Sequence, residues 1–173
     1  MNLKKNLVFL GMMGSGKSSI GLLISKKFNL KFIDVDSIIE NETKTTITNI
    51  FKDKGENYFR NLEEKITIKI LQTNNCVISL GGGAFLNNKI RKEILTNHLS
   101  FWLNWDIKTL LLRIRKNKKR PLAINTTDNE LISLIKSRSK IYSKAKFKIN
   151  CNNLTKTEII KKISKINELN ELN

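Results

Sequence analysis

Short apolar runs alternate with longer amphipathic stretches along the chain. Each run has the length of a strand, and the stretches carry apolar residues at the three- and four-residue spacing of a helix face. Alternating strands and helices favour an α/β fold with a mainly parallel sheet, because parallel strands need crossover connections. The pattern therefore predicts a five-stranded parallel sheet sandwiched by helices, with strands at residues 7–10, 32–35, 77–80, 99–103 and 147–149.

The amphipathic stretches predict a helix after each strand. We expect helices at 17 to about 28, in segments from about 37 to 74, from about 87, from 106 to about 116, after 127 and after 155. Thr127 and Thr155 each precede a glutamate by three residues, which is the pattern of a capping box. Four apolar residues share one helical face between 57 and 72 and are expected in the core: Phe59, Leu62, Ile66 and Ile70.

Size and charge exclude some classes of protein. The 173 residues fit a single domain spanning 1–173. The formal net charge of +17 could indicate a nucleic-acid partner. The lysines are scattered through every segment rather than gathered in one stripe, so we interpret the charge as a compositional bias and expect no nucleic-acid partner. The charge would still attract anionic substrates.

Cysteine usage and hydropathy predict neither a disulfide framework nor a membrane protein. Cys76 and Cys151 lie far apart, with no CxxC motif or Cys/His cluster. The basic, then apolar, N-terminus runs directly into a glycine loop instead of a cleavage site. No apolar run approaches the length of a membrane span. We expect a cytoplasmic monomer.

Residues 11–18 read GMMGSGKS and match the phosphate-binding pattern GxxxxGK(S/T) between a predicted strand and a predicted helix. Glycines let successive backbone N–H groups surround phosphate oxygens, and the helix N-terminus adds partial positive charge. Lys17 is expected to bridge the outer phosphates and Ser18 to ligate Mg²⁺. The alternative is a glycine turn with a chance lysine, which the flanking elements disfavour. The motif predicts a nucleoside triphosphate site, and we interpret the ligand as ATP.

The stretch FIDVDS, residues 32–37, carries two carboxylates one residue apart. The strand that ends before Gly81 has no terminal carboxylate, so the acid on the metal side has to come from FIDVDS. Residues two apart in a strand point to one face, which would place both side chains at the ligand-binding edge of the sheet. We expect Asp34 to hold hydrated Mg²⁺ and Asp36 to orient an acceptor hydroxyl. The alternative for Asp36 is a helix cap.

Candidates for a second ligand follow later in the chain. Gly81, Gly82 and Gly83 follow an apolar strand and favour close approach of a ligand to backbone N–H groups, with a tight turn as the alternative. Arg60 and Arg138 are candidate ligands for an anion, and the alternative for each is a solvated side chain.

The basic run RIRKNKKRPL indicates a lid over the triphosphate at about 113–125. Arg120, just before Pro121, is placed to stabilise charge on the transferring phosphoryl group. Arg113 is placed to stack on the adenine ring. A basic surface loop is the alternative.

Together, these residues resemble the shikimate kinases, small P-loop enzymes that use ATP to phosphorylate the 3-hydroxyl of shikimate on the route to chorismate and the aromatic amino acids. The resemblance covers nearly the whole chain. It rests on GMMGSGKS, FIDVDSIIE, ITNIFKDKGENYFRNLEE, SLGGG, the spacing from Arg113 to Arg120-Pro121-Leu122, and RSKIYSKA. Many nucleotide-binding proteins share the first motif, whereas the set is far more specific. It implies the fold of nucleoside monophosphate kinases, with a mobile lid.

The resemblance also implies roles for single residues and one Mg²⁺ per subunit. ATP would be bound by Gly14, Ser15, Gly16, Lys17, Ser18, Ser19, Arg113 and Arg120. Mg²⁺ would be held by Ser18 and, through water, Asp34. The substrate-binding helices would lie at about 37–73. The residues that bind shikimate would be Asp36, Arg60, Gly81, Gly82, Gly83 and Arg138. The catalytic residues would be Lys17, Asp36 and Arg120.

Three places depart from the family's pattern. Lys44 stands where a glycine is usual, Ser139-Lys140 replaces a pair that ends in proline, and Lys144 stands where an acidic residue is common. We expect these residues on surface turns or helix faces. They would affect local geometry and affinity more than the reaction.

Two other functions stay open at this point. Another small-molecule kinase of the same architecture, such as a gluconate kinase or a nucleoside monophosphate kinase, gives less reason for Asp36, Arg60 and Gly82 to converge. An ATP-regulated nucleic-acid binder would need exposed aromatic side chains. Trp102 and Trp105 lie in or beside a predicted strand and are expected to pack inside.

Overall fold

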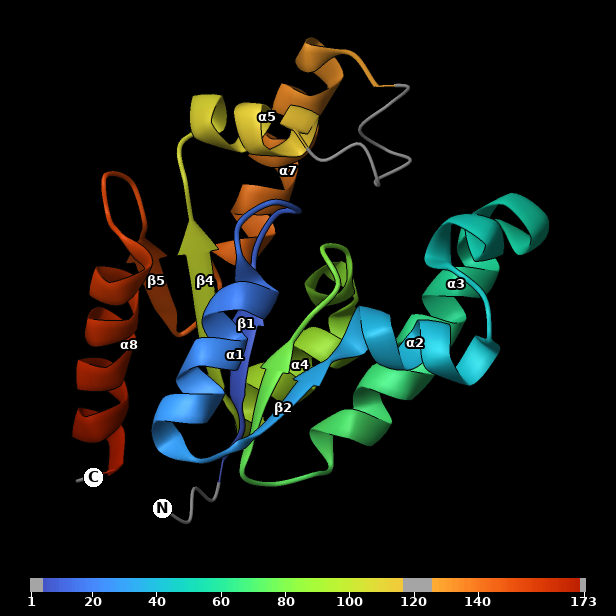
Figure 1. Cartoon of the computed structure of the whole chain (residues 1–173). Helices are drawn as coiled ribbons and strands as arrows, with labels where there is room; N and C mark the ends of the chain where they lie inside the picture. Colours follow the sequence, from blue (N-terminus) through green and yellow to red (C-terminus); the bar gives the residue numbers. More distant parts are fainter. Residues whose placement is uncertain (1–4, 117–125, 172–173) are drawn as a thin grey trace.

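The computed structural model describes residues 5–116 and 126–171, and its centre is a five-stranded sheet in the order β2-β3-β1-β4-β5 (Figure 1). All neighbouring strands are parallel. The strands are β1 (Leu7–Leu10), β2 (Lys31–Asp34), β3 (Cys76–Ser79), β4 (Leu99–Asn104) and β5 (Phe147–Asn150). The predicted parallel sheet is confirmed, with every strand end within one residue of its expected position.

Helices connect the strands, as the amphipathic pattern predicted. They are α1 (Lys17–Phe28), α2 (Val35–Thr43), α3 (Ile47–Leu71), α4 (Asn88–Asn97), α5 (Ile107–Lys116), α7 (Asp128–Tyr142) and α8 (Lys156–Glu171), with a short 3₁₀ turn, η1 (Ala84–Leu86). Both predicted capping boxes form, before α7 and before α8. Gly55 interrupts α3 with a non-helical φ of 79°. Over these residues, no helix has both the length and the apolar character needed to cross a membrane.

Helices cover both faces of the sheet, which explains why the central strand is apolar throughout. All four residues of β1 are buried. Leu7 and Phe9 point to the face covered by α1 and α8, and Val8 and Leu10 point to the face covered by α3, α4 and α7 (Figure 1). The core therefore has two layers with the sheet between them.

The predicted apolar face of α3 is largely correct. Phe59, Ile66 and Ile70 are buried, but Leu62 is only partly buried. The inward position next to it belongs to Glu63, which is 2% exposed. A buried carboxylate on an apolar face needs charged or hydrogen-bonding partners, and these are found at the ligand-binding edge of the sheet.

The departures from the family's pattern lie where they were expected. Lys44, Lys140 and Lys144 are exposed, and Ser139 is partly buried. Lys44 ends α2 in the left-handed conformation, with φ 55° and ψ 25°. This conformation explains why a glycine suits the position, since a side chain is strained there. The turn keeps its shape at a cost in stability.

We predict that Lys44→Gly raises the free energy of unfolding by about 0.5–1 kcal/mol, because glycine adopts this conformation without strain. Urea denaturation would measure the change. The control is Lys65→Gly, an exposed position inside α3, where glycine should lower the stability by about 1 kcal/mol. A loss of stability in both variants would contradict the assignment of strain to Lys44.

Candidate active site

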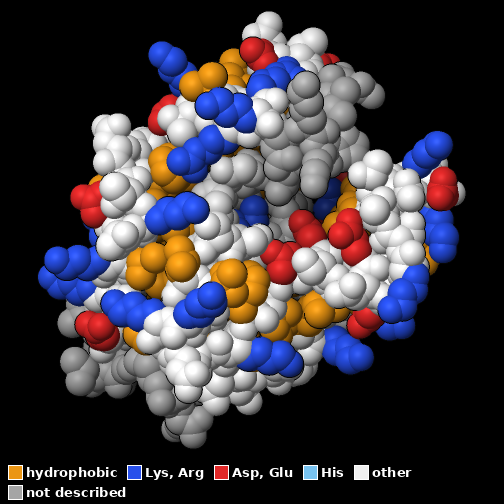
Figure 2. All heavy atoms as spheres, viewed as in Figure 1, with side chains coloured by type: hydrophobic (Ala, Val, Ile, Leu, Met, Phe, Trp, Pro, Cys, Tyr) orange, Lys and Arg blue, Asp and Glu red, His pale blue; other side chains and the backbone are white. Residues whose placement is uncertain are grey.

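The candidate site lies at the carboxyl ends of β1, β2 and β3, three neighbouring strands of the sheet. Parallel strands present these ends at one edge, so the loops after them meet although they are far apart in sequence. Figure 2, in the same view as Figure 1, shows a hollow among these loops with acidic side chains at its rim and basic side chains inside.

The phosphate loop, residues 11–18, leads from β1 into α1. Gly16 precedes the helix with a φ of 91° and gives it no side-chain cap, so the first N–H groups of α1 stay available to an anion. Lys17 is buried, and its Nζ donates to the carbonyl oxygens of Gly11 at 3.0 Å and Met12 at 3.2 Å. The lysine is thus already directed into the loop, where phosphate oxygens would bind.

The remaining predicted residues of the loop belong to the same turn. Gly14 has a φ of 78°, Ser15 is buried, and Ser19 lies partly buried in the first turn of α1. The loop thus forms the strand–loop–helix arrangement that the motif requires.

Two oxygen ligands suited to Mg²⁺ meet beside the loop. Ser18 Oγ donates to Asp34 Oδ2 at 2.5 Å and lies 3.3 Å from Ser79 Oγ. Mg²⁺ prefers oxygen ligands and is usually held by one or two side chains together with water and substrate phosphates. In the described ranges no cluster of three or more His, Cys, Asp or Glu residues forms a separate metal site. The pair Ser18 and Asp34 fits an ion that arrives with a triphosphate.

The strand-based explanation for the two aspartates is wrong. β2 ends at Asp34, and Val35 begins α2, so Asp36 lies in the first helical turn. The helix cap is Asp34, whose Oδ1 accepts from the backbone N–H of Ser37 at 3.3 Å. The alternative that Asp36 caps the helix is therefore wrong as well. The turn from strand to helix separates the carboxylates, with Asp34 beside Ser18 and Asp36 beside the loop after β3.

The loop after β3 needs glycine because side chains occupy the space of a Cβ atom. A Cβ on Gly81 would lie 2.6 Å from both Asp36 Oδ1 and Glu63 Oε1, and one on Gly83 would overlap the Arg60 guanidinium. Neither glycine has a left-handed φ, so space rather than chain reversal explains them. The close approach predicted for a ligand is made here by side chains of the protein.

Gly82 faces a third site residue, Arg138. A Cβ on Gly82 would lie 3.6 Å from Arg138 Nη1, 3.6 Å from the backbone nitrogen of Met13 and 4.0 Å from the carbonyl oxygen of Gly11. The central glycine therefore lies between a buried arginine of α7 and the phosphate loop. The three glycines bring Asp36, Arg138 and Arg60 into one pocket.

Glu63 is a member of this pocket that the sequence analysis missed. Its Oε2 accepts from Arg60 Nη1 at 2.7 Å, and Arg60 also pairs with Glu56 at 3.1 Å. Burial raises the pKa of Glu63, and the nearby Asp36 acts in the same direction, whereas Arg60 opposes the rise. The signal in the sequence was an acid on the apolar stripe of α3, at the spacing that separates Phe59 from the next inward residues.

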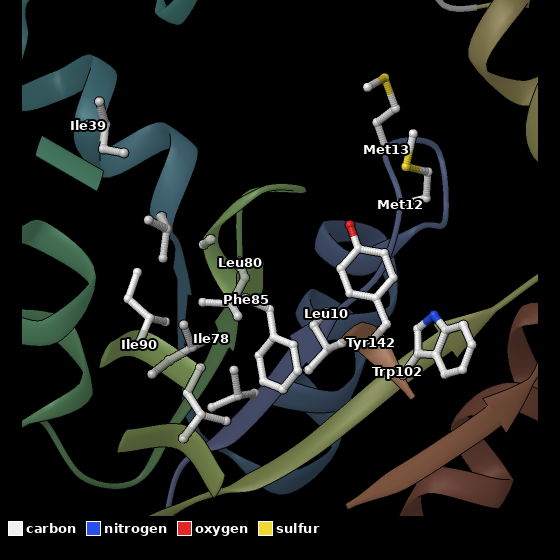
Figure 3. Packing of buried hydrophobic residues seen from close by; sticks show 14 of the residues in the cluster. Leu10, Met12, Met13, Ile39, Ile78, Leu80, Phe85, Ile90, Trp102 and Tyr142 are labelled. Atoms are coloured by element: carbon white, nitrogen blue, oxygen red, sulfur yellow. The ribbon is translucent and has the colours of Figure 1, made fainter. Parts of the chain in front are cut away.

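Arg138 and Tyr142 form the wall of the pocket contributed by α7. Arg138 is 8% exposed, and its Nη1 lies 3.9 Å from Met12 Sδ. Tyr142, one helical turn later, donates its hydroxyl to the carbonyl of Gly82. Burial raises the pKa of Tyr142 to about 12, so the phenol stays protonated as a donor. Figure 3 shows its hydroxyl directed toward the end of the sheet where Met12 and Met13 lie.

Two polar atoms of these residues are buried without a partner in the described part of the chain. Among the residues that the structure describes, Glu63 Oε1 and Arg138 Nε have no hydrogen-bond partner. Unsatisfied buried polar atoms are costly, so each one in a native structure needs an explanation. The pocket thus combines carboxylates that can accept from hydroxyl groups with arginines that can bind a carboxylate.

The structure describes only some of the residues that are expected to bind the nucleotide. Arg113 lies in α5 with its guanidinium carbon 3.6 Å from the centre of the Trp105 ring. Trp102 is buried, as expected, and Trp105 is only partly buried. Arg120 and the rest of the predicted lid after Lys116, up to residue 125, lie outside the described residues.

Comparison with known proteins identifies similar chains over most of this length. A family model described as shikimate kinase matches residues 13–167. A shikimate kinase of Bartonella henselae is 41% identical over 145 residues, which cover 83% of this chain and 69% of that protein. A shikimate kinase of Persephonella marina is 33% identical over 159 residues, 92% of this chain and 96% of that protein.

Solved structures agree with the sequence relatives. A shikimate kinase from Acinetobacter baumannii in complex with shikimate is similar with a TM-score of 0.90 at 27% identity, covering 98% of this chain and 96% of that one. A gluconokinase from Sinorhizobium meliloti 1021 has a TM-score of 0.56 at 16% identity, covering 93% and 90%. The gluconokinase shares the fold alone.

Proposed function

This chain belongs to the shikimate kinase family, and we propose that shikimate binds in the pocket after β3, opposite the phosphate loop. The enzyme transfers the γ-phosphate of ATP to the 3-hydroxyl of shikimate. The products are shikimate 3-phosphate and ADP, on the route to chorismate and the aromatic amino acids. The family match favours this function over that of a gluconate kinase.

One observation supports this placement above the others. Gly81, Gly82 and Gly83 face Asp36, Arg138 and Arg60 in turn, and the space above Gly82 is also bounded by the phosphate loop. An acceptor in this pocket would lie directly beside the phosphates that the loop binds. Phosphoryl transfer depends mainly on such positioning, because its transition state is loose.

On the acceptor side, cationic and anionic side chains would bind different groups of the substrate. Arg60 and Arg138 would bind the carboxylate of shikimate, since the guanidinium fork matches carboxylate geometry. Glu63 would hold Arg60 in place through the 2.7 Å ion pair. Asp36 would accept a hydrogen bond from the 3-hydroxyl and orient its oxygen toward the γ-phosphate. The backbone of Gly81, Gly82 and Gly83 would line the floor.

The donor side would use the phosphate loop and its neighbours. The N–H groups from Gly14 to Ser19 would bind phosphate oxygens, and Lys17 would exchange its carbonyl contacts for the outer phosphates. Ser18 and, through water, Asp34 would hold one Mg²⁺, which neutralises phosphate charge when bound. Arg113 would contact the base. Arg120 would contact the transferring group from a lid at 113–125, which lies largely outside the described residues.

We further propose a location and an oligomeric state for this enzyme. It would act as a cytoplasmic monomer, with residues 1–173 forming one kinase domain whose substrate-binding helices lie at about 37–73. Shikimate and ATP would be its partners, without nucleic acid. The positive net charge of +17 would assist the approach of both anionic substrates.

The direct test is a coupled assay of ADP release with shikimate, gluconate and nucleoside monophosphates as acceptors. We expect Mg²⁺-dependent turnover with shikimate and at least about 100-fold lower kcat/KM with the others, because only shikimate presents both groups that the pocket binds. Turnover with gluconate equal to that with shikimate would refute the assignment of the acceptor.

Asp36→Asn should lower kcat by about 10²–10⁴-fold, the usual contribution of a positioned acid or base. ATP binding, measured by calorimetry, should stay nearly unchanged, because Asp36 faces the other ligand. Asp53→Asn is the matched control, since Asp53 is an exposed carboxylate on the same substrate-binding helices. Unchanged turnover in Asp36→Asn would remove Asp36 from the mechanism.

Glu63→Gln should raise the KM for shikimate about tenfold, because hydrogen bonds to charged groups contribute about 1.5–3 kcal/mol and Arg60 loses its closer and more buried ionic partner, while the pair with Glu56 remains. The KM for ATP should change little. Glu64→Gln is the control on the neighbouring residue, whose carboxylate instead pairs with Lys89 at 2.8 Å and Asn87 at 2.6 Å. Equal effects of the two variants would show that Glu63 has no specific part in acceptor binding.

A further inference from the structure

Trp105 joins the phosphate loop to the helix that carries Arg113. It follows β4 directly, at the carboxyl end of that strand. Its indole Nε1–H donates to the backbone carbonyl of Ser15 in the phosphate loop at 2.9 Å. The same indole ring lies 3.6 Å from the guanidinium carbon of Arg113. One side chain thus contacts both parts of the nucleotide side.

The guanidinium of Arg113 lies unusually close to the indole ring of Trp105. Other cation–ring distances in the described parts of the chain range from 4.6 to 5.8 Å, so 3.6 Å places this guanidinium much closer to its ring. Tryptophan offers the best face for such contacts. The Arg113 Cβ also lies 3.4 Å from the place of a Cβ on Gly14. The base of the Arg113 side chain therefore lies beside the phosphate loop, and its guanidinium lies over the indole ring.

Packing alone does not account for this arrangement. Trp105 is partly buried and packs against both apolar clusters of the core, whereas Trp102, two positions before the end of β4, is 5% exposed. A leucine at position 105 would be apolar but smaller, and would keep only part of this packing. It would provide neither the N–H donor for Ser15 nor a flat surface for Arg113.

We propose that Trp105 is a positioning residue for the nucleotide, which fixes the guanidinium plane of Arg113 as a platform for the base of ATP. The inference rests on the proposed function, because it takes ATP as the ligand of the phosphate loop. A base on the outer face of Arg113 completes a layered stack of indole, guanidinium and purine. The hydrogen bond to Ser15 keeps this platform in register with the loop that binds the phosphates.

The first test is steady-state kinetics of Trp105→Phe and Trp105→Leu in the full-length chain. Trp105→Leu should raise the KM for ATP about three- to tenfold, the range expected for loss of one stacked cation–ring contact. Trp105→Phe keeps a ring and should show a smaller rise. The KM for shikimate should stay within about twofold in both. Equal increases in both KM values would overturn the inference.

Leu112→Ala is the matched control for these variants. Leu112 lies in α5 next to Arg113, is 57% exposed and makes no contact that the inference uses. Its replacement should leave both KM values unchanged. Thermal unfolding of each variant separates a general loss of stability from a specific loss of nucleotide affinity.

A double-mutant cycle tests whether Trp105 acts through Arg113. Trp105→Leu should raise the KM for ATP in the wild-type background but add less than about twofold in an Arg113→Ala background, because coupled residues are not additive. The same increase in both backgrounds would show that Trp105 acts independently of Arg113 and would overturn the inference.

Fluorescence gives a readout that needs neither turnover nor shikimate. The chain has two tryptophans, so Trp102→Phe leaves Trp105 as the sole emitter. Titration with ADP should change its emission in a saturable manner, and Arg113→Ala should abolish the change at the same concentrations. Tryptophan emission that stays constant during the ADP titration would overturn the inference. Failure of the wild type to phosphorylate shikimate would instead refute the proposed function and leave this titration valid.

Discussion

The site depends on a backbone without side chains at Gly81, Gly82 and Gly83. Carboxylate oxygens of Asp36 and Glu63 lie where a Cβ on the first glycine would be, and the Arg60 guanidinium lies where a Cβ on the third would be. Groups from α2, α3 and α7 can therefore meet above one short turn. Because β3 pairs with β1, that turn is also next to the phosphate loop. The same turn thus explains the close packing of these charged groups and their position beside the phosphate loop.

In the part of the chain that the structure describes, some buried polar atoms around the pocket lack hydrogen-bond partners. Glu63 Oε1 and Arg138 Nε are buried without a hydrogen-bond partner among the described residues, and each such group costs about 1–3 kcal/mol. The sheet, covered by helices on both faces, holds these groups in place although they lower the stability. An acceptor bound here as proposed would meet charged groups that are already oriented, so little further ordering would be needed on binding.

The sequence predicted the sheet well, since strands buried on both faces read as uninterrupted apolar runs. It extended the strand alternation of side chains to Asp36, because periodicity cannot show that the strand turns into a helix directly after Asp34, which is itself the helix cap. Glu63 was missed because a lone acid on an apolar stripe acquires meaning only when Arg60 and Asp36 are seen around it. Trp105 was expected to pack inside, and only the structure shows its hydrogen bond to Ser15.

Most side chains of the proposed acceptor side come from the segment that follows β2, the strand at the edge of the sheet. β2 ends the sheet, and α2 and α3 extend from it as one excursion before the chain returns as β3 (Figure 1). The phosphate loop, in contrast, follows the central strand. Mutations in this segment would act on Asp36, Arg60 and Glu63, three of the residues proposed for the acceptor side, and would leave the residues of the phosphate loop in place. Under the proposed assignment, most of the acceptor side would be able to change during evolution while the donor side stays constant.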